Sequence, residues 1–135
     1  IRLLRDEAVL LGGEVYLYGR PDAQRPGRGV EVRKTPAELV EGLDTDKPIL
    51  VLDHQPRELE ALAAAGVDVD LCGHTHDGQM FPGNLTVRLF WENACGCLRV
   101  GSMHSIVTSG VGLFGPNMRV ATRAEICPIT IRFAE

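Results

Sequence analysis

Two histidines separated by a single residue are the part of this sequence best suited to chemistry. They lie in Gly73-His74-Thr75-His76, directly after an apolar run over residues 67–71. In a half-extended backbone, side chains at positions i and i+2 point the same way, so both imidazoles can reach one metal cluster. Neutral imidazole is a ligand for Zn, Mn, Fe and related ions. The spacing therefore indicates a metal site at the end of this run.

A third histidine, His54, follows another apolar run over residues 48–52. We expect a strand over 48–52, a helix from about residue 56 to Gly66 and a strand over 67–71, which together make a βαβ unit. Neighbouring parallel strands lie about 5 Å apart, and their carboxyl ends converge on a common crevice where ligands bind. We therefore expect the three imidazoles to meet there, with Asp53 or Asp77 supplying a carboxylate to the ion or its ligands.

Other segments complete a mixed α/β fold. Strands over 7–11 and 14–18 are joined by Gly12-Gly13, which tolerates the positive φ of a tight hairpin, and residues 20–33 are expected to form a surface loop. A capping box, Thr35-Pro36-Ala37-Glu38, begins a helix over 36–43. Further strands are expected over 105–109 and 126–133. The apolar residues of 48–52 do not alternate with polar ones, which predicts a strand covered on both faces.

The composition describes an ordinary soluble globular protein, with at most one domain over residues 1–135, that is 44% hydrophobic and 24% charged. The formal charge is −4 and no basic run exceeds two residues, which argues against a nucleic-acid partner. No stretch approaches the roughly 20 apolar residues that span a bilayer. Among four cysteines only Cys95 and Cys97 are closely spaced, so we expect reduced and mostly buried thiols.

Two stretches of the chain resemble the calcineurin-like metallophosphoesterases, especially a bacterial branch of membrane-anchored or exported phosphohydrolases. They cover residues 52–56 and 66–82, and their most specific part is His54-Gln55-Pro56 combined with Gly73-His74-Thr75-His76-Asp77-Gly78-Gln79. Residues 108–112, 116–119 and 124–126 also resemble the closing strands of that branch.

The resemblance implies the C-terminal half of a four-layered α/β/β/α sandwich. It implies a phosphoric ester hydrolase that cleaves a phosphomonoester, a phosphodiester or a pyrophosphate bond. Two divalent metal ions, with Mn as the first expectation and Zn, Fe or Mg as alternatives, would be bridged by a carboxylate and a hydroxide. His54 and His74 match ligands of one metal and His76 a ligand of the other. The implied substrate is a small-molecule or lipid-linked phosphate ester, and the implied full-length protein is membrane-anchored or located in the cell envelope.

The family's earlier motifs, Asp-x-His, Gly-Asp-x-x-Asp and Gly-Asn-His-Asp/Glu, do not occur in these 135 residues. In the family they supply the remaining ligands, the bridging Asp and the His that assists the leaving group. We therefore expect the chain to be the C-terminal portion of a larger enzyme whose N-terminal half is absent. We also expect it to be inactive or nearly so alone, and to self-associate through an uncovered apolar sheet face.

Two other functions fit the same residues. The first is a non-catalytic metal-binding module that uses His54, His74 and His76 together with Cys95 and Cys97. The second is an inactive structural remnant in which backbone hydrogen bonds satisfy the histidines.

Several further side chains have two possible roles. Gln79 and Arg119 are candidate substrate contacts, with a loop-fixing amide and an exposed surface arginine as the alternatives. Asp22 is expected to stabilise a turn. Core packing is the first expectation for four aromatic residues, and an apolar wall for a lipid-like leaving group is the alternative; they are Phe81, Phe90, Trp91 and Phe114.

Overall fold

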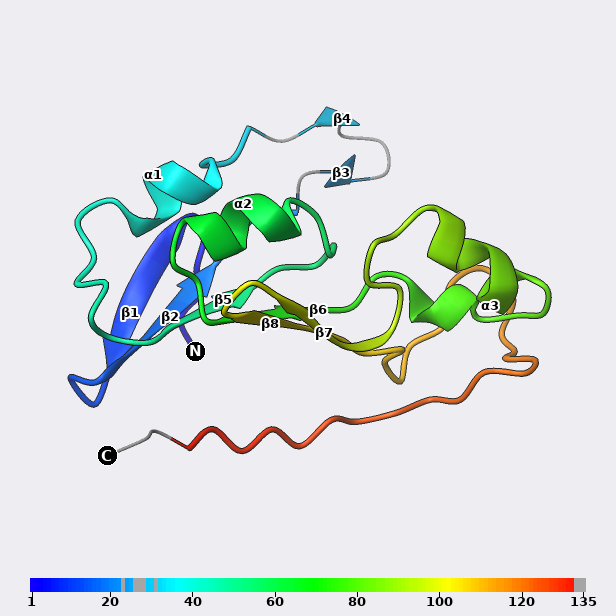
Figure 1. The fold of residues 1–135 in the computed structure, drawn as a ribbon. Helices are drawn as coiled ribbons and strands as arrows, with labels where there is room; N and C mark the ends of the chain where they lie inside the picture. The colour runs from blue at the N-terminus through cyan, green and yellow to red at the C-terminus, as the bar shows by residue number, and fades with distance from the viewer. Residues whose placement is uncertain (23, 26–28, 31, 133–135) are drawn as a thin grey trace.

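In the computed structural model, which describes residues 1–22, 24–25, 29–30 and 32–132, six strands form one sheet (Figure 1). Their order across the sheet is β1-β2-β5-β6-β8-β7. The inner strands β2, β5, β6 and β8 run parallel, whereas β1 and β7 are antiparallel edge strands. Their bounds are Glu7–Leu11 (β1), Val15–Gly19 (β2), Ile49–Leu52 (β5), Val69–Cys72 (β6), Gly96–Val100 (β7) and Met103–Val107 (β8). The predicted α/β class is confirmed.

The predicted hairpin and the predicted βαβ unit are both present. Gly12 and Gly13 turn the chain between β1 and β2 with φ of 61° and 81°, values that cost glycine nothing. Helix α2 (Leu59–Ala64) crosses from β5 to β6, which pair in parallel. The helix begins later than the predicted residue 56 because Glu58 has a left-handed φ of 60°.

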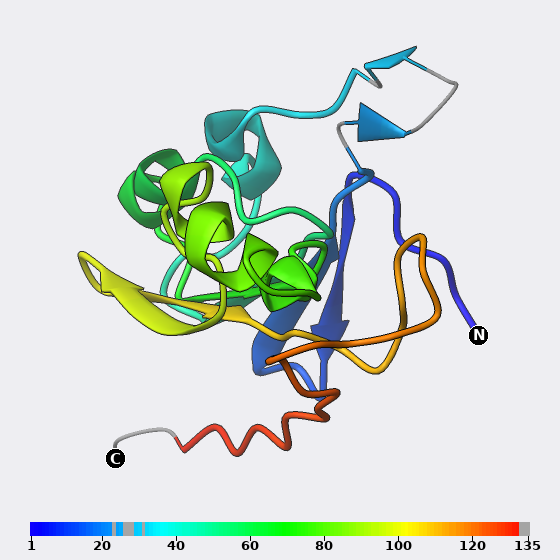
Figure 2. The same cartoon turned by 90° about the vertical axis from the view of Figure 1, so that its right-hand side faces the viewer.

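Helices α1 (Pro36–Val40) and α2 cover one face of the sheet (Figures 1 and 2). The predicted capping box begins α1, since Thr35 Oγ1 accepts from Glu38 N at 3.3 Å and Glu38 Oε2 accepts from Thr35 N at 2.8 Å. Gly42, with a φ of 78°, follows α1 and limits it to a shorter span than predicted. The core lies between these helices and the sheet, and consists of Tyr18, Leu39, Ile49, Val51, Leu59, Leu62, Val67 and Met103.

The opposite face of the sheet is apolar and incompletely covered. Its side chains lie in register across four strands, and each is half-buried or exposed: Leu17, Leu50, Leu52, Val69, Leu71 and Ile106. Strand β5 is therefore buried on one face only, and the prediction that both faces are covered is wrong. The reason is that α1 and α2 lie on the same side of the sheet. One helical layer on one sheet is consistent with half of a four-layered sandwich.

The C-terminal segment runs along this open face (Figure 1) without strand pairing, so the strand predicted over 126–133 is wrong for residues 126–132; residue 133 lies outside the described residues. A carboxylate holds the segment instead of a backbone ladder, because Glu125 Oε1 accepts from Ser109 N at 2.8 Å and from Thr108 Oγ1 at 3.1 Å. Ile126, Cys127 and Ile129 line a hollow of about 310 Å³ together with Leu71 and Ile106.

Several short elements were not predicted. The small strands β3 (Gln24–Arg25) and β4 (Gly29–Val30) pair within the expected surface loop, of which residues 23, 26–28 and 31 lie outside the described part. Between β6 and β7 the chain forms α3 (Gly83–Thr86) and two 3-10 turns, η1 (His76–Gly78) and η2 (Val87–Leu89). Among the described residues, none of the helices is long and apolar enough to cross a membrane.

Candidate metal-binding site

His54 and His74 meet at the carboxyl ends of β5 and β6. His54 Nε2 lies 3.0 Å from His74 Nδ1, and the two rings meet edge to face with centroids 4.8 Å apart. A hydrogen bond of 3.1 Å from Gly73 N to His54 O ties the two loops together. Facing ring nitrogens need a proton or a cation between them, since two lone pairs repel. Both side chains are exposed, so an ion from solution can reach this pair.

His76 does not join this pair. Its ring stacks on Phe114 with centroids 6.5 Å apart, and its Nδ1 is buried without a hydrogen-bond partner. Within the described residues there is no group of three or more His, Cys, Asp or Glu side chains arranged to hold a metal ion. The expected meeting of three imidazoles is therefore not seen. The facing nitrogens of His54 and His74 and the unpartnered Nδ1 of His76 therefore remain as possible ligands of divalent ions.

The segment that carries these histidines is strained. Positive φ values occur at His74 (68°), His76 (52°), Asp77 (51°) and Gln79 (56°), and each such non-glycine residue costs of order 1–3 kcal/mol. The surrounding structure maintains this conformation, because Thr75 Oγ1 donates to Ala94 O at 2.5 Å. Strain of this kind is typical of ligand-binding segments.

Gln79 and Arg119 both hold the loop beside His76. The buried Gln79 amide accepts from Phe114 N at 2.6 Å and donates to Phe114 O and Pro116 O at 2.8 and 3.1 Å. Arg119 Nη1 donates to His76 O at 3.2 Å, and Nη2 donates to three carbonyls of residues 109–112. Three hydrogen bonds between one amide and the main chain of Phe114 and Pro116 are those of a loop-fixing residue, the alternative role expected for Gln79. Substrate contact by either residue stays a prediction.

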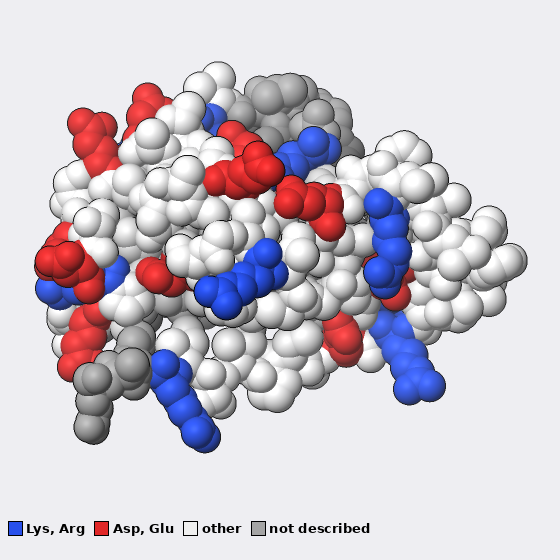
Figure 3. All heavy atoms as spheres, viewed as in Figure 1, with Lys and Arg blue, Asp and Glu red and all other residues white. Residues whose placement is uncertain are grey.

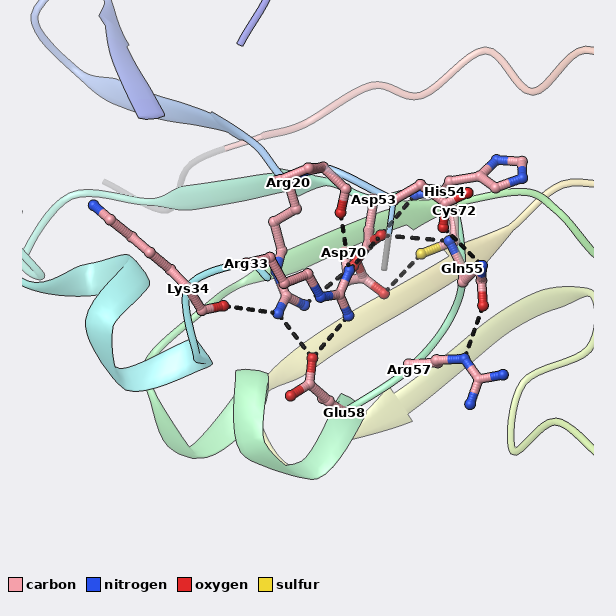
Figure 4. A network of polar contacts seen from close by, with 12 residues as sticks. Arg20, Arg33, Lys34, Asp53, His54, Gln55, Arg57, Glu58, Asp70 and Cys72 are labelled. Atoms are coloured by element: carbon pink, nitrogen blue, oxygen red, sulfur yellow. Dashed lines mark hydrogen bonds and ion pairs between the residues drawn. The ribbon is translucent and has the colours of Figure 1, made fainter. Parts of the chain in front are cut away.

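Asp53 is the centre of a buried ion-pair network (Figure 4). Its carboxylate has no exposed surface and accepts from Arg20 Nη1 at 3.1 Å and from Arg33 Nη1 at 2.9 Å. It also accepts from His54 N at 2.7 Å, while the imidazole of His54 is turned away from the network (Figure 4). Asp53 thus holds the backbone of a candidate ligand.

Glu58 completes the network. Its Oε2 accepts from Arg20 Nη2 and Arg33 Nη2, each at 2.8 Å. Burial raises the pKa of this carboxyl, but the hydrogen bonds from the two guanidinium groups outweigh it and hold the pKa below its usual value. Glu58 therefore stays ionised at neutral pH, and the network fixes the carboxyl end of β5 to the start of α2.

Two further carboxylates lie near the site. Asp22 Oδ1 accepts from Gln55 Nε2 at 2.7 Å, and its charge raises the pKa of His74 against the larger lowering by burial; the expected turn-stabilising role stays a prediction. Asp77 raises the pKa of the Cys95 thiol, after the larger effect of burial.

The expectation of mostly buried thiols is wrong. Among four free cysteines only Cys72 is buried, Cys95 is half-buried, and Cys97 and Cys127 are exposed.

Both loop histidines are biased toward the neutral form. Partial desolvation of the otherwise exposed His74 ring lowers its pKa, and the neighbouring His54 lowers it further. Burial followed by the charge of Arg119 lowers the pKa of His76. Neutral imidazole is the form that binds metal ions, so the environment of both side chains favours metal binding at neutral pH.

The aromatic residues around the histidines do not form a core. Phe81, Phe90 and Phe114 are exposed, so the first expectation of core packing is wrong for them. Trp91 is half-buried and contacts His74, with ring centroids 5.1 Å apart. Trp91 and Phe114 thus place apolar surface against His74 and His76 respectively.

The sequence did not single out Arg20, Arg33 or Glu58. The sequence did contain one indication of the Arg20–Asp53 pair, because Arg20 directly follows β2 just as Asp53 directly follows β5. Because β2 and β5 are parallel neighbours with Gly19 paired to Leu52, the two charged residues must lie together. Recognising the pair required the strand order, which the sequence did not provide.

Comparison with curated proteins identifies relatives of one kind. The chain is 40% identical over 115 residues to a zebrafish (Danio rerio) protein named transmembrane protein with metallophosphoesterase domain, with 81% of this chain and 25% of the relative aligned. It is 33% identical over 133 residues to a metallophosphoesterase of Aquifex aeolicus, covering 97% of this chain and 51% of the relative. A Helicobacter pylori metallophosphoesterase is 36% identical over 129 residues, which is 92% of this chain and 34% of the relative.

The chain thus spans about half or less of the length of these relatives. They come from animals as well as bacteria, so the similarity does not single out a bacterial branch. No family model matches the chain, and no solved structure matches it. The shared names and the extent of the alignments support the resemblance found in the motifs. The chain belongs to the metallophosphoesterase family.

Proposed function

We propose that the protein is a metal-dependent phosphoric ester hydrolase, and that this chain contributes His54, His74 and His76 as ligands of a dinuclear centre. The observation that carries the proposal is the 3.0 Å approach of His54 Nε2 to His74 Nδ1 on the exposed edge of the sheet. The metallophosphoesterase names of the relatives support the class of reaction. His76 is assigned to a second ion because its Nδ1 is buried without a partner.

When bound, divalent ions lower the pKa of a coordinated water and withdraw charge from the phosphate of the substrate. The family resemblance favours Mn, and imidazole donors are equally suited to Zn or Fe. The chain's own residues hold the donors in place. Asp53, fixed by Arg20, holds the His54 backbone, and Arg119 holds that of His76.

The family's other ligand motifs do not occur in these 135 residues. We therefore propose that the bridging carboxylate and the leaving-group histidine come from a part of the full-length protein outside this chain. The chain alone then hydrolyses phosphate esters poorly or not at all.

We propose a small-molecule or lipid-linked phosphate ester as substrate and a membrane-associated full-length protein. Two observations support this. Phe114, which stacks on His76, is exposed, and the zebrafish and cattle relatives are named transmembrane proteins.

The test uses the full-length product with Mn²⁺ and a chromogenic phosphodiester, beside its His74→Ala and His76→Ala variants. His104→Ala is a matched control, because His104 is exposed on β8. Loss of nearly all activity in the first two variants, with His104→Ala active, supports the proposal. If hydrolysis is absent while the chain still binds a metal ion through His54 and His74, a non-catalytic metal-binding module is the better account.

A further inference from the structure

An apolar lobe, which consists of residues 78–91 and 110–124, projects from the end of the molecule that carries α3 (Figures 1 and 2). Its two segments are bound to each other, since Phe81 N donates to Val120 O at 3.0 Å and Val120 N donates to Gln79 O at 3.1 Å. The Gln79 amide adds its hydrogen bonds to Phe114 and Pro116. The lobe is therefore one unit although its segments are far apart in the sequence.

Large apolar side chains of this lobe face solvent. Leu89 is 80% exposed, Phe90 79% and Phe114 75%, and Phe81, Leu85 and Leu113 are exposed as well. The same end of the molecule is almost free of charged atoms in Figure 3. Scattered exposed apolar residues are ordinary, but a concentration of them marks a surface that contacts a partner or a membrane.

The charge of the lobe favours a membrane. Of the chain's 14 basic and 18 acidic residues, the lobe holds three arginines and no acidic residue. Arg119 is turned inward onto backbone carbonyls, whereas Arg88 and Arg123 are exposed. The flanking acids Asp77 and Glu125 are half-buried and Glu92 is exposed. The lobe itself therefore carries net positive charge, while the chain as a whole is negative.

Arg88 lies directly before the exposed Leu89 and Phe90. In the described part of the chain no carboxylate pairs with its guanidinium. An arginine beside exposed apolar side chains suits the boundary of a bilayer, where the apolar groups enter the acyl region and the cation stays among anionic headgroups. A projecting surface can insert its apolar side chains into a bilayer without needing a complementary pocket on the partner.

We propose that the apolar lobe docks this protein on a membrane surface that carries anionic lipid headgroups. Trp91 and Phe114 of the lobe contact His74 and His76, so docking places the candidate metal site at the bilayer surface. Docking names the surface behind the membrane association proposed above and does not depend on hydrolysis; only its consequence for the substrate rests on the proposed hydrolase activity.

The test is flotation of the chain with lipid vesicles in the presence of EDTA, so that the metal site plays no part. Vesicles of phosphatidylcholine are compared with vesicles containing about 25% phosphatidylglycerol. The variants are Leu89→Ser/Phe90→Ser and Arg88→Glu. A matched control is Leu3→Ser/Val32→Ser, which removes two exposed apolar side chains outside the lobe. Circular dichroism verifies that all variants are folded.

The proposal predicts that the wild type and the control float with the anionic vesicles. Leu89→Ser/Phe90→Ser should lower binding about tenfold or more, and Arg88→Glu should lower it at least about fivefold. The proposal is overturned if the wild type stays unbound or if the lobe variants float as well as the wild type. It is also overturned if phosphatidylcholine vesicles bind equally well. If the double variant only converts an oligomer to a monomer, a second copy covers the lobe and the membrane is the wrong partner.

Hydrolysis by the full-length protein is measured separately. A chain that docks on vesicles while the full-length protein lacks activity would refute the proposed function and leave the docking surface intact. A full-length protein that hydrolyses the ester while the chain does not bind vesicles would refute the docking surface and leave the proposed hydrolase activity intact.

Discussion

Arg119 donates a hydrogen bond to the main-chain carbonyl of His76 at 3.2 Å. The same guanidinium holds the carbonyls of Ser109, Gly110 and Gly112. A single side chain from the last part of the chain therefore fixes both the segment of a candidate ligand and the loop that faces it.

Replacing Arg119 with methionine should destabilise the protein by about 2–4 kcal/mol, because several partly buried carbonyls lose a charged donor. Urea denaturation measures the effect. The exposed Arg123 gives the control, for which Arg123→Met should change stability by less than about 0.5 kcal/mol. Equal effects of the two substitutions would contradict a positioning role for Arg119.

The ion pair between Arg20 and Asp53 should contribute more than a surface pair. Neither side chain is exposed, so Arg20→Met leaves a buried carboxylate with Arg33 as its remaining cationic partner, at a cost of about 3 kcal/mol or more. The control is Arg2→Met, since Arg2 and Glu7 are 63% and 39% exposed and such pairs contribute at most about 1 kcal/mol. Similar urea midpoints for the two variants would show that the buried network does not hold the end of β5.

Asp70 should make the stability depend on pH. Burial raises the pKa of this core carboxyl to about 6, despite hydrogen bonds from Cys72 and Ser105. The folded pKa exceeds the unfolded one, so protonated Asp70 contributes to the free energy of unfolding. This contribution is fully present below about pH 4 and is lost as the pH rises through about 6. The loss is on the order of 3 kcal/mol.

Asp70→Asn should remove this dependence. The amide stays neutral, so its free energy of unfolding should not show the decline between about pH 4 and 6 that Asp70 causes. Urea denaturation of both proteins across this range measures the difference. Parallel pH profiles would mean that Asp70 does not titrate as its burial requires.

The open face of the sheet should make the isolated chain self-associate. Leu52 is exposed on this face beside the half-buried Leu71 and Ile106, so Leu52→Lys should weaken association by placing a charge there. Size-exclusion chromatography with light scattering measures the mass as a function of concentration. The control is Leu3→Lys at another exposed leucine. A compact monomer at all concentrations would contradict the expectation.

Local sequence patterns predicted the elements that depend on local chemistry. The Gly12-Gly13 hairpin, the capping box at Thr35 and the βαβ unit are present, because turn geometry, capping and apolar runs act over a few residues. The strand expected at 126–133 was wrong over its described residues, because a strand needs a neighbour to pair with. Strand β7 was missed for a related reason, since it is an edge strand that begins at Gly96 with weak alternation.

The site was predictable in part. The placement of His54 and His74 follows from two parallel strands that end side by side, and the structure brings these two rings together without His76; their role as metal ligands stays a prediction. The direction of the His76 ring depends on the positive φ values of residues 74–79 and on its contact with Phe114. No local sequence pattern predicts these φ values, because tertiary contacts such as the hydrogen bond from Thr75 to Ala94 maintain them.

The proposed function requires that His54 and His74 together bind a divalent ion. Calorimetric titration of the chain with Mn²⁺ and with Zn²⁺ tests this requirement, beside His54→Ala, His74→Ala and the control His104→Ala. We expect that the wild type and His104→Ala bind an ion and that both other variants bind it at least about tenfold more weakly. Equal affinity in all four proteins, or binding in none, would contradict a metal site built on this pair.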